Sequence, residues 1–182
     1  MELAASAAVP RADGGGESPC PRRPARLALV LGALFASLAT PASAASSNVR
    51  ITGLVDLAFN TITDLASDTS QEEDVCVFSS SSTNGYRVTA TGSGSSGAFA
   101  LSAGGNRLAY EVQWNSQAGQ LTGTQLTSGT PLTGLVSSAS QQTCNSGPSA
   151  SASLIVILRA SALSAAVPGT YTGQLNLLIA PE

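Results

Sequence analysis

The chain has 182 residues and a formal net charge of −3, and it contains neither histidine nor lysine. Without histidine it lacks the usual general base and the commonest nitrogen ligand for zinc or copper, and without lysine it cannot form a Schiff base or a Ser-Lys dyad. Its arginines form no basic stripe, which argues against nucleic acid as a partner because phosphate binding needs clustered cations.

The first 44 residues are predicted to be a secretion signal with an N-terminal extension. Residues 1–21 are rich in Ala, Gly and Pro and show no apolar period, and three arginines follow between positions 22 and 26. Residues 27–40 form an apolar run that is shorter than the roughly 20 residues needed to span a bilayer, so no permanent membrane anchor is expected. The Ala-Ser-Ala sequence that ends at Ala44 predicts signal-peptidase cleavage between Ala44 and Ala45.

Residues 45–182 are then expected to form one domain. It carries four arginines against eight acidic residues, a net charge of −4, and two of the three cysteines, Cys76 and Cys144. An even pair of cysteines in an exported protein predicts one disulfide, which would stabilise by about 4 kcal/mol in the chain-entropy model. Two free buried thiols remain the alternative. A two-cysteine metal site is disfavoured because no histidine can complete it.

Apolar residues in the domain recur at every second position, which is typical of β-strands with one buried face. The first such run predicts a strand over residues 49–59, with one face formed by Val49, Ile51, Gly53, Val55, Leu57 and Phe59. Further runs with the same period are Tyr86, Val88 and Ala90; Phe99 and Leu101; Leu108, Tyr110, Val112 and Trp114; and Tyr171, Gly173, Leu175, Leu177 and Ile179.

Two segments depart from this alternation. Residues 154–158 (LIVIL) are apolar throughout, as in a strand buried on both faces. Residues 159–166 are dense in alanine and predict a helical turn or two before Pro168 and Gly169 end it. Clusters of Gly, Ser, Asn and Pro separate the runs, and short strands with such punctuation predict an all-β sandwich or barrel.

No constellation of residues indicates catalysis, and no cofactor is expected. Serine is plentiful, but there is no Gly-x-Ser-x-Gly motif and no histidine to activate a serine. Tyr110 and Trp114 share the alternating face of Leu108 and Val112, so core packing is favoured over a sugar-stacking platform.

One cluster of charge stands out, and it consists entirely of carboxylates. We interpret it as a solvated connection between strands; calcium binding and paired-carboxylate hydrolysis are the alternatives, and the spacing matches no EF-hand loop. The members of the cluster are Asp64, Asp68, Glu72, Glu73 and Asp74.

Three segments together resemble the secreted pilin-like proteins of chaperone–usher systems, in particular the spore coat protein U domain group and its archaic pilus relatives. They are residues 51–59 (ITGLVDLAF), residues 75–77 (VCV) followed by 85–90 (GYRVTA), and residues 168–177 (PGTYTGQLNL). The resemblance implies an immunoglobulin-like β-sandwich that lacks one strand. In that family a periplasmic chaperone, and then the neighbouring pilin subunit delivered through an usher, completes the sandwich by donating an extended segment.

The chain departs from the family pattern in two respects. Its first strand carries no cysteine, and only residues 45–48 lie between the predicted cleavage site and Val49, where a donor segment would be expected. Either residues 49–59 themselves donate, or the protein accepts a strand without donating one. The leading hypothesis is a non-enzymatic subunit of a fimbria or coat, secreted through the periplasm to the cell surface. The alternative is an adhesin-like sandwich that binds glycans or surfaces through its loops.

Overall fold

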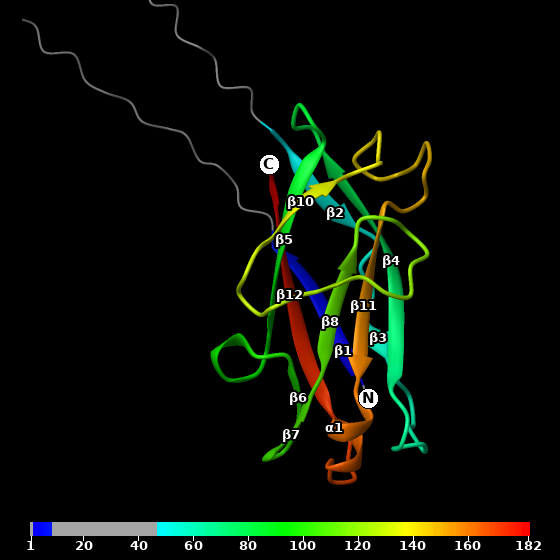
Figure 1. The fold of residues 1–182 in the computed structure, drawn as a ribbon, viewed down its shortest axis with the longest axis vertical. Helices are drawn as coiled ribbons and strands as arrows, with labels where there is room; N and C mark the ends of the chain where they lie inside the picture. Colours follow the sequence, from blue (N-terminus) through cyan, green and yellow to red (C-terminus); the bar gives the residue numbers. More distant parts are fainter. Residues whose placement is uncertain (1, 9–46) are drawn as a thin grey trace, which may run out of the picture. The chain divides into compact units, whose positions relative to one another are not determined.

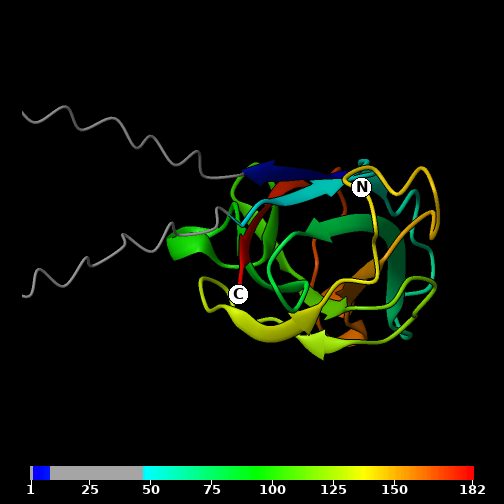
Figure 2. The same cartoon turned by 90° about the horizontal axis from the view of Figure 1, so that it is seen from above.

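The computed structural model describes residues 47–182 and, as a backbone strand, residues 2–8. Within these ranges the chain is nearly all β, and the strands form two sheets that pack face to face (Figures 1 and 2). The predicted β-sandwich is therefore confirmed. The helical turn expected within 159–166 is present as α1 (Ala160–Ser164), and a short 3-10 helix occupies Ser95–Gly97.

The first sheet has the strand order β10-β5-β12-β1-β3, and the β6–β7 hairpin is attached to it through β12. All of its pairings are antiparallel except that of β1 with β12, which is parallel. Its strands are β1 (Glu2–Ala8), β3 (Leu57–Ala58), β5 (Gly85–Gly92), β6 (Ala100–Ala103), β7 (Asn106–Ala109), β10 (Leu132–Val136) and β12 (Thr172–Pro181).

The second sheet is antiparallel throughout, with the strand order β2-β4-β11-β8-β9. Its longest strand, β4, pairs with β11 over residues 69–75 and with β2 over residues 76–79. Its strands are β2 (Val49–Thr52), β4 (Thr69–Ser79), β8 (Glu111–Asn115), β9 (Thr124–Gln125) and β11 (Ala152–Leu158).

Most of the alternating runs bury the face that their period predicts. On β5 the buried residues include Tyr86, and on β8 they include Trp114, whose indole N–H donates to the Tyr86 hydroxyl at 3.1 Å. The two rings meet edge to face with their centroids 6.5 Å apart, which joins the two sheets at the centre of the core. Tyr110 and Trp114 are both buried, so they are core residues and not an exposed sugar-stacking platform.

Strand β11 is buried on both faces, as its continuous apolar sequence predicts. A polar loop is fastened to its outer face. The hydroxyl of the fully buried Ser153 accepts the N–H of Gln120 at 3.0 Å, and the N–H of Gly119 donates to the Asp74 carboxylate on the adjacent strand at 2.7 Å. The loop therefore closes the outer side of β11 with directed hydrogen bonds.

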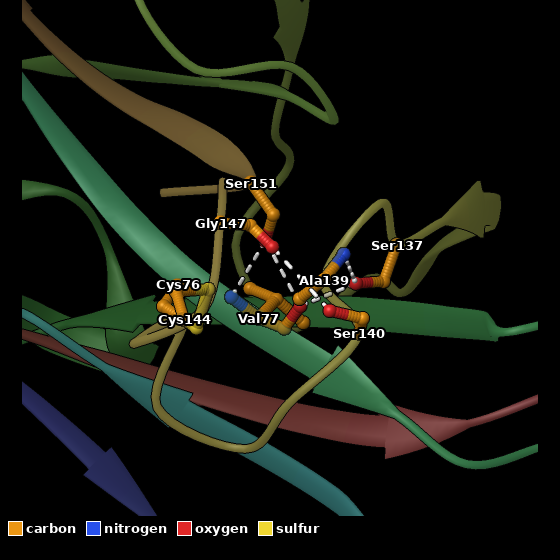
Figure 3. The surroundings of a disulfide bond; sticks show 8 residues. All are labelled: Cys76, Val77, Ser137, Ala139, Ser140, Cys144, Gly147 and Ser151. Atoms are coloured by element: carbon orange, nitrogen blue, oxygen red, sulfur yellow. Dashed lines mark hydrogen bonds between the residues drawn. A yellow bond between two sulfur atoms is a disulfide. The ribbon is translucent and has the colours of Figure 1, made fainter. Parts of the chain in front are cut away.

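The predicted disulfide is present and joins β4 to the loop that precedes β11 (Figure 3). The Cα atoms of Cys76 and Cys144 are 5.9 Å apart, and both residues are buried. Beside this bond the β4–β11 ladder ends, and the Ser151 hydroxyl replaces it by accepting the N–H of Val77 at 2.8 Å and donating to the Val77 carbonyl at 2.9 Å. The Ser137 hydroxyl donates to the same carbonyl, so the loop is anchored at both its ends.

Removal of the disulfide is expected to destabilise the fold without changing it. The bond joins residues 68 positions apart, so Cys76→Ser with Cys144→Ser should lower the free energy of unfolding by about 4 kcal/mol in the chain-entropy model. Urea unfolding under non-reducing conditions measures the loss. Cys20→Ser is the matched control and should leave the midpoint unchanged. Native protein in which both Cys76 and Cys144 titrate as free thiols would contradict the prediction.

Replacement of Ser151 by alanine tests whether its hydroxyl substitutes for the missing ladder. Ser151→Ala leaves the main-chain N–H of Val77 unpaired and removes one of the two hydroxyls on its carbonyl, so we expect a loss of about 1–3 kcal/mol. Ser161→Ala, at an exposed position on α1, should change the stability by less than about 0.5 kcal/mol. Equal unfolding midpoints for the two variants would refute the assigned role.

Candidate strand-binding edge

The segment predicted as one strand over residues 49–59 is divided between the two sheets. β2 pairs with β4 in the second sheet, and β3 pairs with β1 in the first. Ile51, Leu57 and Phe59 are buried and Val49 is half-buried, but Gly53 is exposed and Val55 is 62 % exposed. The single buried face expected for this run therefore does not exist. Residues 53–56, here called the crossover segment, carry the chain from one sheet to the other.

Two features turn the chain at the crossover segment. Gly53 has a φ of +90°, in the left-handed region that glycine enters without a Cβ penalty. Two residues later, the N–H of Val55 donates to the side-chain carboxylate of Glu73 on β4. A chain that leaves β4 loses the main-chain acceptors of that strand. The Glu73 carboxylate supplies an acceptor for the Val55 N–H where the chain changes sheets.

Glu73 corrects the interpretation of the acidic stretch as a solvated loop. Glu72, Glu73 and Asp74 lie within β4, and Glu73 is on its core face, opposite Leu154 of β11, with only 7 % of its surface exposed. Its Oε2 is buried and has no hydrogen-bond partner among the described residues. Burial, reinforced by the charges of Asp56 and Glu72, raises the pKa of Glu73 to about 7 against the opposing effect of the Val55 N–H.

The other acidic residues are on the surface or on the outer face of the sheet. Asp64 and Asp68 are exposed, as expected, and Asp68 lies 2.7 Å from Arg159 in an ion pair. The N–H of Ala160 and the Arg159 guanidinium lower the pKa of Asp68. Arg159 also pairs with Glu111 at 2.5 Å, which links the ends of three strands of the second sheet.

Glu72 and Asp74 share the outer face of β4 and influence each other. Burial and the neighbouring Asp74 raise the pKa of Glu72. Burial acts in the same direction on Asp74, but hydrogen bonds from Gly119 and Ser153 outweigh it and lower the Asp74 pKa. Glu73 points to the opposite face, so the three carboxylates do not converge. Within residues 2–8 and 47–182 no group of three or more His, Cys, Asp or Glu side chains is placed to hold a metal ion.

Strand β1 fills a gap in the first sheet. It lies between β12 and β3, in dark blue beside the red β12 in Figure 1. Its parallel register with β12 runs from Glu2 opposite Thr172 to Ala8 opposite Leu178, and its antiparallel register with β3 covers Glu2 and Leu3. Residues 47–182 alone would thus present β12 and β3 as two facing edges, one strand apart. We call this pair of edges the β12–β3 edge.

Strand β1 could not be predicted from the sequence. Residues 2–8 lie within the predicted signal and extension, and the segment ELAASAA has no alternation of large apolar residues. β1 pairs with β12 through the main chain, and the spacing of apolar residues does not indicate such pairing. The predicted cleavage site at Ala44 and Ala45 lies outside the described residues.

Three other edge strands, β10, β9 and β2, are poor templates for another strand. β10 is interrupted by a register shift around Gly134, whose N–H donates to the Glu182 carboxylate at 2.8 Å. β9 has two residues and β2 has four. Short and irregular edges discourage strand addition, whereas the side of β12 that faces β1 is regular over seven residues.

A cavity of about 380 Å³ lies where the loop after β3 meets the segment before β12. Its lining includes Ile62, Leu65, Leu163 and Tyr171, and it contains no carboxylate or cationic side chain. The Tyr171 hydroxyl, its one titratable group, donates to the Val167 carbonyl at 2.9 Å. The cavity therefore offers apolar surface and no acid–base pair.

No family model matches this chain, and no curated protein matches it significantly. In the described part of the chain, no helix has the length and apolar character that would let it cross a membrane.

The titration of Glu73 predicts that the protein becomes less stable as the pH rises toward neutrality. A carboxyl whose pKa is raised from 4.5 to about 7 on folding contributes stability that is complete below pH 4.5 and is lost as the pH passes through about 7. Glu73→Gln keeps an acceptor for the Val55 N–H and removes the charge. At pH 8 this variant should have a free energy of unfolding about 2–3 kcal/mol higher than that of wild type. Between pH 5 and 8 its free energy of unfolding should change less with pH than that of wild type.

Urea unfolding at several pH values measures both effects. Asp64→Asn is the matched control, since the lowered pKa of Asp64 keeps that carboxylate charged throughout this range. The control should keep the wild-type slope. Equal slopes for wild type and Glu73→Gln would show that Glu73 does not titrate between pH 5 and 8.

Proposed function

We propose that this protein is a structural subunit of an extracytoplasmic fibre or coat and acts by strand exchange, without catalysis or a cofactor. It would be secreted through the periplasm to the cell surface. There its β12–β3 edge would receive an extended segment, first from a periplasmic chaperone and then, at the usher, from a neighbouring subunit. The observation that carries the proposal is that the first sheet of the body formed by residues 47–182 has a gap one strand wide.

The physics of such a gap favours strand addition. On one side β12 is fully paired with β5 from Leu175 to Pro181, so it is held in the extended conformation that a new strand needs. On the other side its main-chain groups have no partner within residues 47–182 over the length that β1 covers. An ordered edge of this kind binds an extended segment through main-chain hydrogen bonds, and pockets for alternate side chains supply specificity.

The strand order also supports the immunoglobulin-like arrangement that the resemblance implies. One sheet contains the order β2-β4-β11-β8 and the other β5-β12-β1-β3. Residues 49–59 contribute β2 to one sheet and β3 to the other, with the crossover segment between them. In the arrangement that the resemblance implies, the missing strand would enter between β3 and β12.

Residues 49–59 are better suited to the body than to donation. Ile51, Leu57 and Phe59 belong to the main buried cluster, and β2 pairs with β4 over all four of its residues. Withdrawal of this segment would open the core and remove one boundary of the gap. We therefore favour a subunit that accepts a strand and does not donate residues 49–59, as a terminal subunit of a fibre would.

Site-specific photo-cross-linking during export tests strand acceptance. A photo-reactive residue is placed at Asn176, which is exposed on β12 and lies opposite Ser6 of β1. If the proposal holds, it cross-links to a periplasmic chaperone in transit and to a pilin-like subunit after assembly, with both partners identified by mass spectrometry.

The same photo-reactive residue at Thr133 is the matched control. Thr133 is also exposed but lies on β10, at the opposite edge of the same sheet. It should give no product with either partner. Equal labelling from both positions, or a secreted monomer that cross-links to neither partner, would reject the proposed function.

A further inference from the structure

We propose that residues 2–8 are an internal latch that covers the β12–β3 edge of the uncleaved chain and keeps it closed to other strands. The inference rests on the proposed function and adds a step that determines when the β12–β3 edge can bind another strand. As long as β1 is joined to the body, the subunit would be self-sealed. Once the chain is cut between Ala44 and Ala45, the latch would be free to leave.

The pairing of β1 is what a latch requires. Its seven residues pair one by one with seven consecutive residues of β12, without a bulge. At its first two residues it also pairs with β3, so it is bounded on both sides where it enters the gap. Any strand that adds to this side of β12 needs the same main-chain groups, and the two cannot bind together.

The covalent connection determines how strongly the latch competes. Residues 9–46 join β1 to the body through 38 positions. A segment tethered by a linker of moderate length competes at an effective concentration on the order of millimolar. After cleavage the same segment competes only at its bulk concentration. At micromolar protein this amounts to a roughly thousandfold loss, so cleavage alone would change the state of the edge.

The composition of the latch suits a temporary occupant. Residues 2–8 contain one large apolar residue, Leu3, and four alanines. Main-chain pairing is available to any sequence, but the stability gained by apolar burial grows with the area buried, and alanine has little area to bury. A donated strand with larger apolar residues at alternate positions would therefore displace the latch once the tether is cut.

Hydrogen exchange on the full chain tests the latch directly. Successive amides of β12 point to opposite neighbours, so about half of those in 172–178 face β5 or its continuation and the rest face β1. In the wild-type chain the set that faces β1 should be protected. Amides of this set that exchange as fast as those of exposed loops would overturn the proposal without any variant.

Ala4→Pro combined with Ala5→Pro opens the latch by design. The two positions are adjacent, so one of the two lost N–H groups points toward β12 whichever way the strand is turned. We expect at least tenfold faster exchange at the amides that face β1 and no change at those that face β5. Ala12→Pro with Gly14→Pro is the control, with two prolines outside β1, and should exchange as wild type.

A labelled peptide of residues 2–8 provides a second measurement. It should bind the Ala4→Pro/Ala5→Pro chain at least tenfold more tightly than the wild-type chain, whose own β1 competes with it. Equal binding to both chains, or to neither, would overturn the latch.

The latch and the proposed function fail in different ways. If cross-linking at position 176 to purified chaperone is equally strong in the uncleaved wild-type and uncleaved double-proline chains, strand acceptance stands and the latch is overturned. If the double-proline variant frees the β12 amides and binds the peptide, but no chaperone or subunit cross-links, the latch stands and the proposed function fails.

Discussion

The hydrogen-bonding capacity of β12 is the constraint on which the rest of the structure depends. A strand within a sheet needs partners for the main-chain groups on both of its sides. β5 supplies them on one side from within residues 47–182, and β1 supplies them on the other from residues 2–8. In the first sheet a segment remote in sequence thus lies between β12 and β3, and the function proposed for the edge follows from this arrangement.

The crossover segment explains why the gap has two defined sides. If residues 49–59 had continued along β4 as one strand, no strand would lie opposite β12 across the gap. Gly53 turns the chain, and the Glu73 carboxylate receives the Val55 N–H that the turn takes away from a ladder. The buried Glu73 carboxyl has one oxygen without a partner among the described residues, which is unfavourable for stability. Glu73 lies where the chain changes sheets, the change that places β3 opposite β12.

The sequence could predict those features that depend on side-chain period and missed those that depend on the main chain. Alternation located the buried residues of β5, β8 and β12, and an even cysteine pair located the disulfide. The period failed at Val55, where the chain changes sheets, and charge alone misplaced Glu73, because burial depends on which strand face a residue occupies. β1 could not be found at all, since its pairing leaves no trace in the pattern of large apolar residues.

The disulfide and the buried side-chain hydrogen bonds that hold the body together lie away from the β12–β3 edge, and this bears on the proposed strand exchange. The disulfide, Ser137 and Ser151 all hold the loop before β11 to β4, which also carries β2 and Glu73 (Figure 3). Tyr86 and Trp114 join the sheets in the centre of the core. Under the proposed exchange, a body tied at these points would remain folded while one strand leaves and another enters, because none of these contacts involves β1. The proposed exchange would then replace the strand that pairs with β12 over seven residues and with β3 over two.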